Sequence, residues 1–259
     1  MTGWLAILLV CAVAAACGAD RSRGRGAIRV AAASDLNAAL GDIIARFSAT
    51  HAVDVAATYG SSGNFFSQLM NGAPFDVFLS ADMEYPRRLA ERGLTIQGSE
   101  FSYGVGRLVL WTPAASPLAA RGGGLRTLTD PSVARVAIAN PEHAPYGRAA
   151  VAAMKTAGVY DAMHGKLVYG ENIGQALQFA QSGAADAAIV ALSLVAAPSG
   201  ARSGRWFDIP LADYPRVVQG GVIMRAAADP ASAQAFRAFL LDQEGRSILE
   251  QYGFSPPEP

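Results

Sequence analysis

The stretch IRVAAASDLNAALGDIIARF, residues 28–47, decides the fold because two hydrophobic periods meet in it. Residues 28–33 form a short run that is apolar except for Arg29, which is consistent with a buried strand. From Leu36 to Phe47 the apolar residues recur every three or four positions, which predicts a helix with Ser34 as its N-cap. A buried strand that leads directly into a helix is the building unit of a parallel α/β sheet.

The same pattern recurs along the rest of the chain. Strands that alternate with helices are predicted at residues 53–58, 77–79, 136–139, 166–169 and 187–190. Two further apolar runs, Val105–Trp111 and Val217–Met224, are predicted as strands that cross between two lobes. We therefore expect an α/β protein in which residues 27–104 and 218–259 form lobe 1 and residues 105–217 form lobe 2.

The N-terminal segment has the character of an export signal. Residues 4–16 are continuously apolar, which is too short for a membrane span and typical of a signal-peptide core. We expect residues 1–17 to be the signal peptide and residues 18–26 a flexible tether. Small residues precede Cys17, so lipidation at Cys17 and ordinary cleavage are both open, and the mature chain is expected in the periplasm, either free or anchored.

The charged and metal-binding residue types exclude several classes of protein. Lys plus Arg and Asp plus Glu both number 21, and this neutral balance argues against a nucleic-acid partner. The two cysteines, Cys11 and Cys17, lie in the leader, which excludes Cys-based metal sites and disulfides in the folded part. The three histidines lack metal-binding spacing, so we expect no metal-cation site and no cofactor.

Two serine-bearing turns in lobe 1 follow predicted strands. Ser34-Asp35 opens the first helix, and Ser61-Ser62 lies between two glycines before the next one. The N–H groups at helix starts favour anions, although a capping serine and a plain turn are the alternatives. Neither Ser61 nor Ser62 has the flanking glycines of a hydrolase nucleophile elbow, and no Walker lysine follows.

Two turns in lobe 2 also follow predicted strands, at residues 139–148 and 170–174. Because ligands of open α/β sheets bind at the carboxyl ends of strands, we expect all four turns to face one cleft. Arg148 is the basic residue nearest to this cleft, and we interpret it as a solvated residue of a helix start rather than a ligand contact.

Six segments carry a resemblance to a known family. They are AAASDL (31–36), YGSSGNFFSQL (59–69), NGAPFDVFLSAD (71–82), ANPEHAPYGRAA (139–150), GENIGQAL (170–177) and the terminal YGF (252–254). These segments resemble the periplasmic molybdate-binding proteins of ABC importers, in order from about residue 28 to 254.

The resemblance implies a fold and a function. The fold is the two-lobed periplasmic binding protein type II fold, with a mainly parallel sheet in each lobe. The implied function is capture of molybdate or tungstate. The protein would act as a monomer, and it would not be an enzyme. The implied partners are a membrane permease and its ATPase. Binding of another oxyanion, such as phosphate or sulfate, remains the alternative, and a serine hydrolase is less favoured.

The resemblance also implies site residues. Ser62 would contact the anion through its hydroxyl and N–H groups, the Ser34-Asp35 pair would add a first-turn contact, and Tyr146 and Ile173 would donate backbone N–H groups. With Ser61 beside Ser62, the candidate oxyanion-binding residues are Ser34, Asp35, Ser61, Ser62, Tyr146 and Ile173.

One donor of the family is missing in this sequence, and one predicted strand carries polar residues at its ends. A tyrosine donor of some relatives aligns with Ala191 here, so Tyr146, or more weakly Ser193, is a candidate replacement. We interpret the polar residues around the third predicted strand as structural rather than ligand-binding, namely Asp76, Ser80 and Asp82.

Asp35 departs from the family pattern, in which a hydroxyl donor stands at this place. A carboxylate that faces a dianion in a dry cleft is repelled. We therefore expect Asp35 to turn away toward its own helix terminus. If it faces the site instead, it would accept a hydrogen bond from a protonated oxyanion such as hydrogenphosphate.

Overall fold

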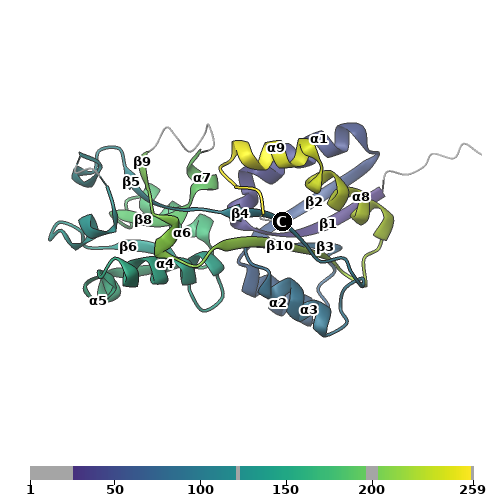
Figure 1. The fold of residues 1–259 in the computed structure, drawn as a ribbon, viewed down its shortest axis with the longest axis horizontal. Helices are drawn as coiled ribbons and strands as arrows, with labels where there is room; N and C mark the ends of the chain where they lie inside the picture. Colours follow the sequence, from purple (N-terminus) through teal and green to yellow (C-terminus); the bar gives the residue numbers. More distant parts are fainter. Residues whose placement is uncertain (1–25, 121–122, 197–203, 258–259) are drawn as a thin grey trace, which may run out of the picture.

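The computed structural model describes residues 26–120, 123–196 and 204–257, and these residues form two lobes that lie end to end (Figure 1). The predicted signal peptide, both cysteines and nearly all of the tether lie outside the described residues. No helix of the described part is long and apolar enough to span a membrane.

Lobe 1 is built on a five-stranded sheet with the order β2-β1-β3-β10-β4. β1 pairs in parallel with β2 and β3, whereas β10 runs antiparallel to both β3 and β4. The strands are β1 (Gly26–Ala33), β2 (Val53–Gly60), β3 (Val77–Ser80), β4 (Phe101–Gly106) and β10 (Val217–Ile223).

Helices cover both faces of this sheet. On one face α1, α8 and α9 bury Leu40, Phe236 and Ile248, and on the other α2 and α3 bury Phe65 and Leu89 (Figure 1). Their bounds are η1 (Ser34–Leu36, a 3-10 helix), α1 (Asn37–Thr50), α2 (Ser62–Met70), α3 (Glu84–Glu91), α8 (Pro230–Leu241) and α9 (Gln243–Gln251).

Lobe 2 has a second five-stranded sheet, with the order β7-β6-β8-β5-β9. β6 pairs in parallel with β7 and β8, and β5 runs antiparallel to β8 and β9. Trp111 of β5 is fully buried in the core of this lobe. The strands are β5 (Leu108–Pro113), β6 (Val136–Ala139), β7 (Leu167–Gly170), β8 (Ala187–Ala191) and β9 (Gly204–Asp208).

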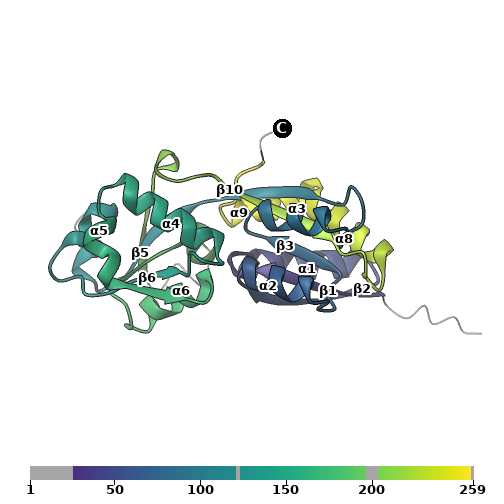
Figure 2. The ribbon, with the colours of Figure 1, turned by 90° about the horizontal axis from the view of Figure 1, so that it is seen from below.

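The helices of lobe 2 surround this sheet (Figure 2). The α-helices are α4 (Pro145–Thr156), α5 (Tyr160–Met163), α6 (Ile173–Gln181) and α7 (Leu192–Ala196). The 3-10 helices are η2 (Pro117–Ala120), η3 (Leu125–Thr129), η4 (His164–Lys166) and η5 (Leu211–Asp213).

Two sequence-based expectations need correction. The predicted single strand Val105–Trp111 is divided at Arg107, because β4 pairs with β10 in lobe 1 while β5 pairs with β8 in lobe 2. Ser34 does not cap a helix: it opens the 3-10 helix η1, and α1 begins only at Asn37. Its hydroxyl oxygen instead accepts the N–H of Gly174 in lobe 2, 3.4 Å away.

Candidate functional site

A small cavity lies between the lobes, at the carboxyl ends of strands from both sheets. Its volume is about 10 Å³, so in this closed arrangement it suits a compact ligand rather than one of sugar or peptide size. All six residues that the sequence nominated line it, and the full lining is Ala33, Ser34, Asp35, Gly60, Ser61, Ser62, Ala81, Ala144, Pro145, Tyr146, Asn172 and Ile173.

Ser62 is held so that its hydroxyl hydrogen is free. The residue begins α2 directly after β2 and is buried. Its Oγ accepts the backbone N–H of Ala81 over 2.9 Å. Because a hydroxyl accepts and donates at once, this bond leaves the hydrogen available for a ligand in the cavity.

Ser61 joins the two lobes instead. Its Oγ caps α2 by accepting the N–H of Asn64 over 3.3 Å. The same Oγ lies 2.8 Å from Nδ1 of His143, a lobe 2 residue. The Ser61 hydroxyl is therefore already engaged in this closed arrangement, although the residue lines the cavity.

The start of α6 brings backbone donors from lobe 2. Asn172 caps this helix by accepting the N–H of Gln175 over 3.0 Å, and Ile173 is its first residue. The first N–H groups of a helix have no partner within the helix and carry the positive end of its dipole. Ile173 is thus placed to donate its backbone N–H into the cavity.

Asp35 is the unusual member of the cavity. Its side chain is fully buried, and neither carboxylate oxygen makes a hydrogen bond of normal geometry within the described residues. Burial raises the pKa of Asp35 from its ordinary 3.8 to about 7, and this rise is only partly opposed by the nearby Tyr146 hydroxyl, the Gln219 amide and the N–H groups of Asp35 and Leu36.

The expectation that Asp35 turns away from the cleft is therefore wrong. The carboxyl group lies near the N–H groups of Asp35 and Leu36 in its own 3-10 helix η1, but it does not turn away from the cleft. It lines the cavity and lies near Tyr146 of the opposite lobe.

A buried hydrogen-bonded chain supports Tyr146. The Tyr103 hydroxyl donates to Oε1 of Gln219 over 3.0 Å, and Nε2 of Gln219 donates to the Tyr146 hydroxyl oxygen over 3.1 Å. The hydroxyl hydrogen of Tyr146 remains free to donate toward Asp35 or a ligand. Burial raises the pKa of both tyrosines well above the ordinary value, so both stay neutral donors.

Gln219 was not identified from the sequence, although a signal was present. It is a fully buried polar residue within β10, a strand that reads as apolar. A buried polar side chain needs a partner, which marks such a position for attention. Its partners Tyr103 and Tyr146 are distant in sequence, and only the fold brings them together.

Two further candidates do not reach the cavity. Ser193 donates its hydroxyl to the backbone carbonyl of Asp35 over 2.7 Å, so it supports η1 and does not replace the missing tyrosine. Arg148 pairs with Asp82 across the lobes over 2.6 Å and also donates to the Tyr85 hydroxyl over 3.4 Å. Arg148 lies in the first turn of α4 and outside the cavity lining, but its partly exposed side chain also links the two lobes, which the sequence did not indicate.

Direct contacts hold the lobes together around the cavity. The N–H of Gly63 donates to the carbonyl of His143 over 2.9 Å, and the side chains of Asn64 and Glu171 are hydrogen bonded. Together with the Arg148–Asp82 pair, these contacts show that the structure is the closed form.

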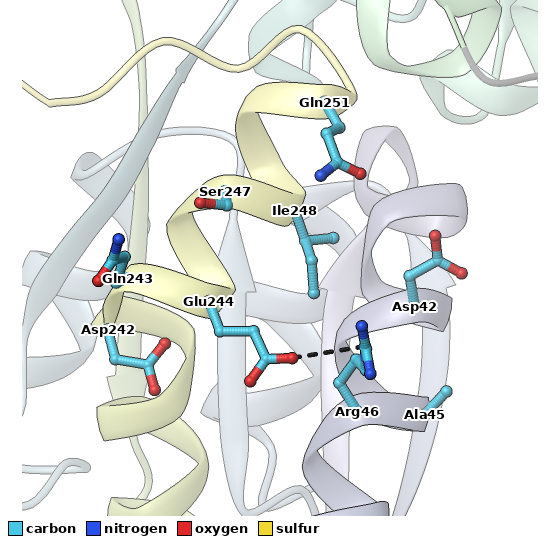
Figure 3. Close-up of a pocket in the computed structure, with 9 residues that line it drawn as sticks. All are labelled: Asp42, Ala45, Arg46, Asp242, Gln243, Glu244, Ser247, Ile248 and Gln251. Carbon is cyan, nitrogen blue, oxygen red and sulfur yellow. Dashed lines mark ion pairs between the residues drawn. The ribbon is translucent and has the colours of Figure 1, made fainter.

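A larger hollow lies elsewhere, between α1 and α9 of lobe 1 (Figure 3). It measures about 830 Å³ and is lined by charged and polar side chains, with Arg46 and Glu244 3.4 Å apart. None of the six nominated residues lines it. Its open, polar character is that of a surface groove, so the strand-end cavity remains the candidate site.

The strand-end cavity offers neutral donors. Among its described lining residues there is no Lys, Arg or His, and no group of three or more His, Cys, Asp or Glu gathers anywhere in the described part of the chain. Hydroxyl and N–H donors at helix starts can replace the water shell of an anion without a net positive charge.

The chain is similar in sequence to proteins named as molybdate-binding proteins. The chain is 37% identical over 229 residues to the molybdate-binding protein ModA of Rhodobacter capsulatus, with 88% of each chain covered. It is 36% identical over 227 residues to ModA of Azotobacter vinelandii, covering 88% of this chain and 89% of the relative.

A solved structure and a family model extend the likeness to the fold. The periplasmic molybdate-binding protein of Azotobacter vinelandii superposes with a TM-score of 0.84 at 30% identity, over 89% of this chain and all of that one. The model of the bacterial extracellular solute-binding proteins matches residues 28–255. The predicted two-lobed type II fold is thereby confirmed, and the chain belongs to the family of bacterial extracellular solute-binding proteins.

Proposed function

We propose that this protein captures molybdate or tungstate in the cavity between its lobes. The observation that carries the proposal is the convergence of Ser34, Ser62 and the start of α6 on one small closed cavity. The relatives named as molybdate-binding proteins support the choice of anion. Ser62, Tyr146 and Ile173 would bind the oxygen atoms of the anion through neutral donors.

Closure is the proposed mechanism of capture. Each lobe carries part of the donor set, so an anion in the cleft favours the state in which both lobes reach it. The chain passes between the sheets at Arg107 and just before Val217, and we propose these two connections as the hinge. Closure removes water from the anion and replaces it with fixed donors.

We propose delivery to the permease and ATPase of an ABC importer, by a periplasmic monomer that has no nucleic-acid partner. Residues 1–17 would direct export, and Cys17 would either be lipidated or stay outside the mature chain.

The protein would bind its ligand without converting it. Ser61 lies near His143, but its Oγ is engaged in the cap of α2.

An anion panel tests the proposal. In calorimetric titrations of the purified protein, we expect tight binding of molybdate and tungstate and much weaker binding of sulfate, because sulfate is smaller and would contact fewer of the fixed donors. Phosphate binding that is tight, in the absence of molybdate binding, would contradict the proposal and favour the alternative oxyanion.

Ser62→Ala is expected to weaken molybdate binding by about 1–3 kcal/mol, the effect of losing one hydrogen bond to a charged group. Calorimetry measures the change in dissociation constant. Ser67→Ala is the matched control, because Ser67 lies on the exposed side of the same helix. Thermal melts of both variants check the fold, since Ser62 also accepts the Ala81 N–H. An unchanged dissociation constant for Ser62→Ala would place the ligand elsewhere.

A further inference from the structure

The proposed set of neutral donors gives no role to the buried carboxyl group of Asp35. It lines the cavity at the end of β1, is fully buried, and has no hydrogen-bond partner of normal geometry among the described residues. Burial without a partner strongly disfavours a charged carboxylate. The side chain is also positioned beside the space in which a dianion would bind.

The groups around Asp35 do not neutralise its charge. Tyr146 of α4 and Gln219 of β10 are its nearest polar neighbours, and Tyr103 of β4 lies behind them. These are neutral donors, since burial raises the pKa of both tyrosines well above the ordinary value.

The remaining neighbouring elements bring no free cation either. From α7, Ser193 reaches only the backbone carbonyl of Asp35, and from β2, Tyr59 is a phenol whose pKa burial raises. Arg148 of α4 pairs with Asp82, after β3, so this arginine is already paired. In the described part of the chain, no positive charge contributes to the pKa of Asp35.

We propose that Asp35 holds a proton in the closed, loaded state and donates it as a hydrogen bond to an oxygen of the bound dianion, so that capture of molybdate takes up one proton from solution. This inference rests on the proposed function. Asp35 then acts as a specificity residue: a carboxylic acid that donates like the hydroxyl it replaces, provided that it is protonated.

The affinity for molybdate should depend on pH, because the pKa of Asp35 differs between the open and the closed state. In an open state water would reach Asp35, and its pKa would lie near the ordinary value of an exposed carboxyl group. In the closed state burial raises that pKa to about 7, and a bound dianion raises it further. Between these two values closure binds a proton, so the affinity for molybdate falls by about tenfold for each unit rise in pH. Below the lower value Asp35 is protonated in both states and no longer contributes to the pH dependence.

The proton also distinguishes anions. Molybdate carries no proton at neutral pH, so the proton must come from solution. Hydrogenphosphate brings its own proton, which an ionised Asp35 would accept. Capture of molybdate is therefore expected to take up a proton at neutral pH, whereas capture of hydrogenphosphate is not.

Calorimetry of the purified protein with sodium molybdate tests the inference. Titrations at pH 7 in buffers of different ionisation enthalpy give the number of protons taken up, which we expect to be about one. A second series between about pH 5.5 and 7 should show the tenfold fall per unit. Asp35→Asn, whose amide donates without titrating, should still bind molybdate with no proton uptake and a flat pH profile. Asp42→Asn, which alters an exposed carboxyl on α1, should keep the proton uptake.

The experiment distinguishes failure of the role of Asp35 from failure of the proposed function. Molybdate binding without proton uptake, or a pH dependence that persists in Asp35→Asn, would overturn the role of Asp35 and leave the proposed function standing. No binding of molybdate at any pH would overturn the proposed function, and the inference with it. The proton count on the unaltered protein decides the matter even if Asp35→Asn does not fold.

Discussion

Gly63→Ala is expected to lower the affinity for molybdate at least a hundredfold while the protein remains folded. A Cβ at Gly63 would lie 2.6 Å from the carbonyl oxygen of His143, 2.7 Å from its Cβ and 2.7 Å from the Tyr85 hydroxyl at the end of a lobe 1 side chain, and all three distances are below van der Waals contact. His143 belongs to lobe 2, and a backbone carbonyl cannot rotate aside, so the lobes would have to stay apart.

The size of this effect follows from the donors that lobe 2 supplies. An anion left on lobe 1 would lose its bonds from Tyr146 and Ile173, about 1.5–3 kcal/mol each for a charged acceptor, and about 1.4 kcal/mol corresponds to a factor of ten. Gly63 lies in α2, where alanine is tolerated, so the unliganded protein should melt near the wild-type temperature. Calorimetry and thermal melts measure the two quantities separately.

Gly41→Ala is the matched control, because Gly41 lies in α1 and a Cβ there meets nothing within 4 Å. It should leave the affinity unchanged and raise the free energy of unfolding by up to about 1 kcal/mol. Wild-type affinity in Gly63→Ala would show that the ligand is not held by lobe closure.

Asp76→Ala is expected to reduce the free energy of unfolding by about 2–6 kcal/mol without altering the site. Oδ2 of this fully buried residue accepts the backbone N–H of Arg29 over 2.6 Å, and Oδ1 accepts that of Ala228 over 2.8 Å. Removal of the carboxylate leaves two N–H groups without their acceptor, at about 1–3 kcal/mol each. The contacts agree with the structural interpretation of Asp76 made from the sequence.

Urea unfolding measures this loss, and calorimetry on the folded variant should give a dissociation constant close to that of the wild type. Asp76→Asn keeps an oxygen acceptor and should lose less stability. Asp161→Ala, at an exposed position of α5, is the surface control and should change little. Lost binding with an unchanged unfolding midpoint would instead place Asp76 in the binding site.

Local sequence patterns predicted most elements and the place of the candidate site. Hydrophobic periodicity is a property of neighbouring residues, so the strand and helix of residues 28–47 could be recognised, as could the turns that carry Ser34, Ser62 and Ile173. The rule that ligands lie at the carboxyl ends of strands then brought these turns to one cleft. The division of the first crossing strand at Arg107 escaped, because both halves are equally apolar and only their pairing differs.

The sequence by itself thus determined the α/β class, the order of the elements and the four turns that line the cavity. Only the tertiary structure decided what the polar side chains do there. Asp35 turns inward, Arg148 pairs with Asp82 across the lobes, and Gln219 supports Tyr146. The physical reason is that the partners of Arg148 and Gln219 lie 66 and 73 positions away, and the closure of the lobes around Asp35 sets the burial and the pKa of its carboxyl group.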